Sequence, residues 1–245
     1  MALNIIVTIQ KELRSKADAE KSTLLARFFK TGPGEYADGD KFLGLTVPTT
    51  RAIVKKYAHD ATLNDVGQLI KSEYHEERLT ALLILVYFAQ HKKYPVSELG
   101  KFYMSHVQHI NNWDLVDLSS PRIIGPYVCD CMIHEQRKKF IDDCIVSTHL
   151  WTVRVIVLAS FYPISLENEK MSLYIASRLL HHKHDLIHKA VGWMLREVGK
   201  RVDESALTDF LDQHAHEMPR TMLRYAIERL SIEKRKHYMN IKHKG

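Results

Sequence analysis

The chain has 245 residues, of which 45% are apolar, and it carries a formal net charge of +6. Ten glycines and seven prolines are fewer than a protein with many turns contains, so long helices are favoured over a strand-rich fold. Three cysteines, an odd number without a Cys-x-x-Cys pair, argue against a disulfide framework or a structural zinc site and fit a reducing cytoplasm.

The N-terminal stretch "MALNIIVTIQKELRSKAD" has neither a basic start nor a cleavage site, so we expect no signal peptide. An apolar stripe in it predicts a first amphipathic helix; the stripe consists of Ile5, Ile6, Ile9 and Leu13. A second helix is expected over residues 18–29, followed by a loop at "TGPGEYADGD". Pro48 suits the first residue of a third helix, which carries Arg51, Lys55 and Lys56.

Polar residues indicate further helix starts at Thr62, with Asp65 three positions on, at Ser165 and at Asp203. The apolar run "LTALLILVYFA" is 11 residues long, too short to cross a bilayer, and predicts a buried helix. We therefore expect an all-helical protein without a membrane-spanning segment.

A weak internal repeat has a polar residue in the same column of five segments. The spacings along this column are 37, 37, 35 and 35 residues, and its members are Thr80, Asp117, Arg154, Lys189 and Arg224. Periods of this size are typical of helix pairs that stack into a solenoid. The repeat predicts a single all-α solenoid domain over residues 1–245, with this column on one concave, positively charged face. Chance alignment of ordinary amphipathic helices is the alternative.

The segment "NNWDLVDLSSP" places Trp113 and Asp117 one helical turn apart on one face. Trp151 lies three residues before Arg154, and Trp193 lies four residues after Lys189. All three tryptophans are therefore close to the polar column. A single tryptophan usually belongs to the hydrophobic core, but a core position is a weaker explanation for three tryptophans that all lie near one polar column.

The C-terminal end, residues 218–245, is strongly basic. It has eight lysines and arginines against two glutamates, and this excess of six positive charges equals the net charge of the whole chain. Such an end can bind phosphate groups or can be a solvated tail. His184 and His188 are one turn apart, but no third ligand is indicated, so we expect no metal and no cofactor.

Several segments resemble the AlkD-type DNA alkylation repair glycosylases, a family of HEAT-like repeats, over roughly residues 20–236. They are "ARFF", "KFLGLTVPTTR", "NWDLVD", "LWTVRVIVL" and "HKAVGWMLREVGK". By this resemblance Asp117 is the catalytic carboxylate, Trp113 and Trp193 are the two tryptophans of the site, and Arg154 grips backbone phosphate. Further expected DNA contacts are Lys189, Arg196 and Arg224.

The sequence departs from the best-known form of that family at three positions. Asn112 stands in place of a tryptophan, Phe28 in place of a tyrosine and Thr46 in place of a glutamine. These differences affect the range of lesions accepted and some DNA contacts. They leave the expected catalytic carboxylate in place.

The resemblance implies a cytoplasmic, monofunctional glycosylase that removes cationic N3- or N7-alkylpurines from double-stranded DNA without a cofactor or an obligatory protein partner. It also implies that the lesion stays stacked in the duplex during the reaction. The alternative is a helical-repeat protein without catalytic activity that binds distorted DNA or a protein partner. Release of free methylated base distinguishes the two.

Overall fold

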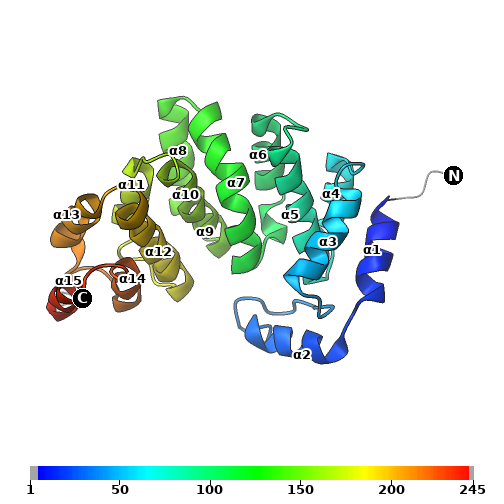
Figure 1. The fold of residues 1–245 in the computed structure, drawn as a ribbon, viewed down its shortest axis with the longest axis horizontal. Helices are drawn as coiled ribbons and strands as arrows, with labels where there is room; N and C mark the ends of the chain where they lie inside the picture. Colours follow the sequence, from blue (N-terminus) through cyan, green and yellow to red (C-terminus); the bar gives the residue numbers. More distant parts are fainter. Residues whose placement is uncertain (1–4, 243–245) are drawn as a thin grey trace. The chain divides into compact units, whose positions relative to one another are not determined.

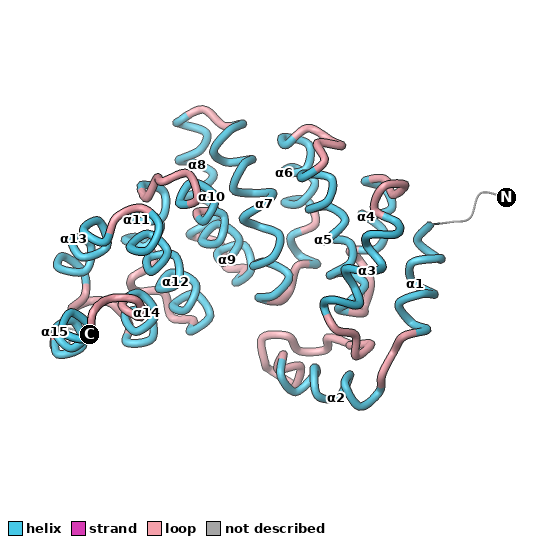
Figure 2. The backbone as a smooth tube through the Cα atoms, viewed as in Figure 1, coloured by secondary structure: helices cyan, strands magenta, loops and turns pink. Residues whose placement is uncertain are grey.

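The computed structural model describes residues 5–242 as an all-helical protein, with fifteen α-helices and one 3₁₀ turn in that range and no strand longer than an isolated bridge (Figures 1 and 2). The predicted fold class is confirmed. Backbone contacts divide the chain into two compact units, residues 1–119 and 120–245. None of the described helices has the length and apolar character needed to cross a bilayer.

Within residues 5–119, unit 1 contains six helices, a 3₁₀ turn and the beginning of a seventh helix. These are α1 (Ile5–Ser15), α2 (Ala19–Phe28), α3 (Val47–Tyr57), α4 (Leu63–Leu69), α5 (His75–Gln90), α6 (Val96–Ser105), η1 (Val107–His109) and α7 (Trp113–Cys131). Helices α1, α3, α4, α5 and α6 lie side by side, whereas α2 crosses at one end of them (Figure 1).

Unit 2 begins within α7 and contains the remaining helices. They are α8 (His134–Ile145), α9 (Leu150–Ala159), α10 (Phe161–Ile164), α11 (Lys170–Arg178), α12 (Asp185–Arg201), α13 (Glu204–His214), α14 (Arg220–Ala226) and α15 (Ile232–Asn240). Helix α12 is central, since α9, α10, α11, α13 and α14 all pack against it.

Capping residues fix several helix starts where the sequence predicts them. Thr62 and Asp65 form a reciprocal capping box at α4, and Asp203 caps α13 through the backbone N–H of Ser205. Pro48 lies in the first turn of α3, whose N-cap is Thr46. These contacts satisfy backbone donors that have no partner within the helix.

The prediction of a helix start at Ser165 is wrong. Ser165 ends α10, and its hydroxyl donates a hydrogen bond to the carbonyl of Tyr162 at 2.6 Å instead of accepting one from a following N–H. The chain then turns through Glu167 in the left-handed region (φ 60°), and the next helix begins at Lys170.

The loop between α2 and α3 is held against both α2 and α5. The buried carboxylate of Glu76 accepts hydrogen bonds from the backbone N–H groups of Leu43, Gly44 and Leu45 at 2.8, 2.8 and 3.1 Å. Gly44 has φ of +85°, and a Cβ there would lie 2.1 Å from the carbonyl oxygen of Asp18. Only glycine allows this close approach of the loop to α2.

Candidate functional site

The first turn of α7 places two of the expected catalytic residues. Asn112 is fully buried, its side-chain oxygen accepts a hydrogen bond from the N–H of Trp113 at 2.8 Å, and its carbonyl accepts one from Val116. Because α7 continues from here without interruption, Trp113 and Asp117 lie one turn apart on the same helix, as predicted. The departure at Asn112 thus supports the start of the helix.

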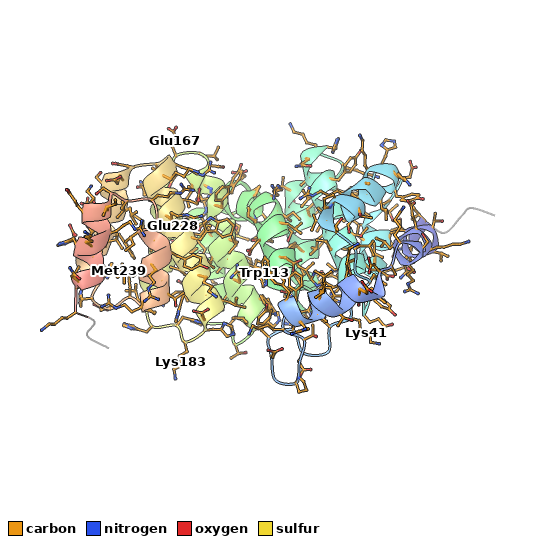
Figure 3. All side chains as sticks on the ribbon, turned by 60° about the horizontal axis from the view of Figure 1, so that its bottom comes forward. Lys41, Trp113, Glu167, Lys183, Glu228 and Met239 are labelled. Atoms are coloured by element: carbon orange, nitrogen blue, oxygen red, sulfur yellow. The ribbon has the colours of Figure 1, made fainter. Side chains whose placement is uncertain are left out.

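Aromatic side chains of α2 and the following residue hold the Trp113 ring. Phe29 stacks on it with ring centroids 5.3 Å apart, and Phe28 meets it edge-on at 6.1 Å. The indole N–H donates to the hydroxyl of Tyr36 at 3.3 Å. In Figure 3 the labelled Trp113 lies beside one end of α2. Phe28 is 63% exposed, so its ring extends this aromatic surface to solvent.

Asp117 is half-buried on α7. It lies close enough to the fully buried Tyr103 that burial and the Asp117 charge together raise the pKa of the Tyr103 phenol. The Tyr103 hydroxyl is hydrogen-bonded to Ser119, one half-turn beyond Asp117, at 2.9 Å. Tyr103 therefore stays neutral beside the carboxylate at physiological pH.

A buried polar cluster lies directly behind Trp113. His75 Nε2 and Asp114 Oδ2 are 2.8 Å apart, and Asp40 pairs with Arg78 at 2.7 Å while accepting a hydrogen bond from Asn111 at 2.8 Å. Burial alone would lower the pKa of His75, but Asp114 and Asp40 outweigh it and raise the pKa to about 9. His75 is therefore a cation at neutral pH.

An apolar cavity of about 320 Å³ adjoins this cluster within unit 1. Its walls come from α2, the loop after it, the start of α5 and Asp114 of α7. The rings of Phe28, Phe29 and Phe42 contribute to the lining together with His75. The cavity is thus continuous with the aromatic residues that contact Trp113.

In unit 2 the expected phosphate ligand Arg154 lies in a buried position. The residue is 5% exposed, and its Nη1 donates to the carbonyl of Leu186, in the first turn of α12, at 2.6 Å. The guanidinium thereby stabilises the packing of α9 against α12. Its role as a phosphate contact stays a prediction.

Trp193, on α12, is hydrogen-bonded to a buried glutamate one turn further along. Its indole N–H donates to Glu197 Oε1 at 3.2 Å, and Arg201 Nε donates to the other carboxylate oxygen at 2.6 Å. Burial raises the pKa of Glu197, but Arg201, Arg196 and Trp193 outweigh this effect and lower it. Glu197 is therefore ionised and orients the indole.

The other expected DNA contacts also lie on α12 and α14. Lys189 forms an ion pair with Asp185 at 2.8 Å, Arg196 pairs with Glu228, and Arg224 is exposed. His184 and His188 make hydrogen bonds to backbone groups at the same end of α12. No group of three or more His, Cys, Asp or Glu within residues 5–242 could hold a metal ion.

The structure brings Trp113 and Asp117 together in unit 1. In unit 2, Lys189, Trp193 and Arg196 lie along α12, and Arg154 reaches the first turn of α12 from α9. Two members of the predicted polar column, Thr80 and Arg154, are buried instead of lying on an open face. Thr80 is fully buried and donates its hydroxyl to the Glu76 carbonyl at 2.7 Å, because α5 is covered by α3, α4 and α6. It therefore lines no open face.

Sequence reasoning missed the residues that support the two tryptophans: Phe29, Tyr36, His75, Asp114 and Glu197. Asp114 and Glu197 lie in the same sequence motifs as Trp113 and Trp193, so their proximity to the tryptophans could have identified them. Tyr36 and His75 are 77 and 39 residues from their α7 partners, so no local pattern pairs them.

Comparison with known proteins places the chain in a family. A solved structure titled a predicted DNA alkylation repair enzyme from Enterococcus faecalis superposes with a TM-score of 0.66 and 16% sequence identity, over 88% of this chain and 97% of that one. This likeness shows a shared fold. No curated protein matches the sequence. Residues 9–230 match the model of the DNA alkylation repair enzyme family, and the chain belongs to that family.

Proposed function

We propose that the protein is a DNA glycosylase that hydrolyses the N-glycosidic bond of cationic N3- or N7-alkylpurines in double-stranded DNA. The observation that carries the proposal is the pairing of Trp113 and Asp117 one turn apart on α7, with the Trp113 ring fixed by Phe29 and Tyr36. Family membership supports DNA as the substrate.

The proposed chemistry needs one carboxylate and no general acid. An alkylated purine carries a positive charge, so it leaves with the electron pair of the bond to C1′ and becomes neutral. Positive charge develops on the sugar as that bond breaks, and the Asp117 carboxylate stabilises it. Water then bonds to C1′ and its proton passes to Asp117 and on to solvent.

The remaining residues bind the substrate. The indole faces of Trp113 and Trp193 attract a cationic nucleotide, each by about 0.5–2 kcal/mol. Arg154, Lys189, Arg196 and Arg224 are proposed to contact backbone phosphates, which sets the register of the protein on the duplex without reading the base sequence.

The test is single-turnover release of 7-methylguanine from methylated duplex DNA by the wild type and by Asp117→Asn at saturating enzyme. The variant keeps the size of the side chain and loses its negative charge, so we expect the rate to fall by about 10²–10³, in line with other losses of one electrostatic contact. Affinity for abasic DNA should be retained.

Equal rates within a factor of two would show that Asp117 is not the catalytic carboxylate. A wild type that binds alkylated DNA and releases no base would instead favour the alternative, a non-catalytic protein that recognises distorted duplex.

A further inference from the structure

His75 connects the two parts of unit 1 that hold Trp113. One is the loop between α2 and α3, which carries Asp40 and Tyr36, and the other is the first turn of α7, which carries Asp114. The His75 ring contacts Asp114 through Nε2 at 2.8 Å and Asp40 through Nδ1 at 3.5 Å. The second distance is an ionic contact longer than a well-formed hydrogen bond.

This bridge is buried, so its charges are poorly screened. The His75 side chain is 2% exposed, and the Asp40 side chain is 6% exposed. Phe42 stacks on the imidazole at 4.5 Å and Phe29 lies at 5.2 Å. A buried cation between two carboxylates attracts both. Without it Asp114 would lose its ionic contact with His75, whereas Asp40 would keep Arg78.

Trp113 depends on both ends of the bridge. Its backbone follows Asn112 and precedes Asp114, and its indole N–H donates to Tyr36 in the loop that Asp40 anchors. Phe29 stacks on both His75 and Trp113. A change in His75 would therefore alter the position of the indole through α7, through the loop and through the Phe29 ring. It would also affect Asp117, which lies on the same helix as Trp113.

We propose that His75 is a positioning residue for the glycosidic-bond hydrolysis, which fixes the Trp113 and Asp117 side chains by bridging Asp40 and Asp114 as a cation. The inference rests on the proposed function for its catalytic readout. It adds to that function a residue that does not touch the substrate.

The charged groups around His75 determine the direction of the pH effect. They are Asp114 on α7, Asp40 in the loop, Arg78 and Glu76 on α5, and Lys21 of α2 across the cavity. The two aspartates outweigh burial and Arg78, so the pKa of His75 is raised to about 9. His75 is thus a cation at neutral pH, and the charge that attracts both carboxylates is lost as pH rises through 9.

The first experiment measures single-turnover release of methylated base between pH 6.5 and 10. The wild type should lose activity with a midpoint near pH 9. His75→Gln, which keeps a hydrogen-bonding side chain without the charge, should be about 10- to 100-fold slower at pH 7.5. Its rate should not show the loss of activity near pH 9. Asp114→Asn should lower the midpoint pH of this loss of activity by about one unit or more.

A matched control separates positioning from loss of stability. Phe88→Leu alters a fully buried residue on the same helix α5 whose ring packs on Tyr94. It should lower Tm and leave both the rate at pH 7.5 and the alkaline midpoint unchanged. The proposal is overturned if His75→Gln retains the wild-type rate and pH profile, or if Phe88→Leu reproduces its loss.

A second experiment does not require activity. The indole N–H signal of Trp113, assigned from Trp113→Phe, is followed by NMR against pH. It should shift with a midpoint near 9 in the wild type and stay constant in His75→Gln, and a constant signal in both would overturn the bridge. If no base is released but the indole titrates, the glycosylase proposal fails and the bridge remains.

Discussion

Arg154 and Arg224 differ most in their surroundings among the basic residues proposed to contact DNA. Arg154 is buried and donates to the Leu186 carbonyl, whereas Arg224 is exposed on α14. Truncating Arg154 leaves a carbonyl at the start of α12 without that donor, which costs roughly 1–3 kcal/mol when the acceptor is buried. Truncating an exposed arginine has no such penalty.

We therefore expect Arg154→Ala to lower both Tm and the affinity for abasic duplex DNA, and Arg224→Ala to lower only the affinity. Thermal melting and fluorescence anisotropy at one fixed salt concentration measure the two effects. If Arg154→Ala lowers Tm and leaves the dissociation constant unchanged, Arg154 holds α9 to α12 and does not contact phosphate.

One carboxylate of α5 holds residues 43–45 of the loop between α2 and α3. Glu76 accepts three backbone hydrogen bonds from this loop in a buried position. Glu76→Gln would turn an amide N–H₂ toward N–H donors, so we expect a loss of about 3 kcal/mol of unfolding free energy. Glu73→Gln is the control, since Glu73 pairs with Lys41 at the surface, and its Tm should not change.

Helix boundaries were predictable where one side chain decides them. Thr62 with Asp65, and Asp203, bond to backbone N–H groups within three residues, and Pro48 acts through its own fixed φ. In these cases the local sequence contains the whole effect. Ser165 shows the limit of this reasoning, because a serine hydroxyl can donate to the end of one helix as readily as it can accept at the start of the next.

The residues of the candidate site likewise divide into those that local sequence predicts and those that it does not. Trp113 and Asp117 follow from a helical spacing of four, and Trp193 from its motif. The residues that hold them come from distant segments, as with Tyr36 and His75, and the burial of Arg154 results from packing that no periodicity in α9 reveals. The polar column likewise includes Thr80 because its side chain is polar, but the repeat does not reveal that neighbouring helices cover this residue.

The net charge of +6 equals the excess at the basic end of the chain, and this concentration of charge has a measurable consequence for the whole molecule. In α15, Lys234 pairs with Glu204 at 2.5 Å, whereas Arg235 and Lys236 are exposed. Each phosphate contact releases counterions on binding, so the logarithm of the affinity falls with the logarithm of salt concentration by about 0.9 per contact on duplex DNA.

The double variant Arg235→Gln/Lys236→Gln therefore tests whether the basic end binds DNA. If both side chains contact phosphates, the slope of the salt dependence should decrease by about 2. Lys11→Gln/Lys16→Gln is the matched control, because it removes the same charge from exposed positions near the start of the chain. Equal slopes in the two variants would show that Arg235 and Lys236 serve solubility, and that the phosphate contacts lie elsewhere in the chain.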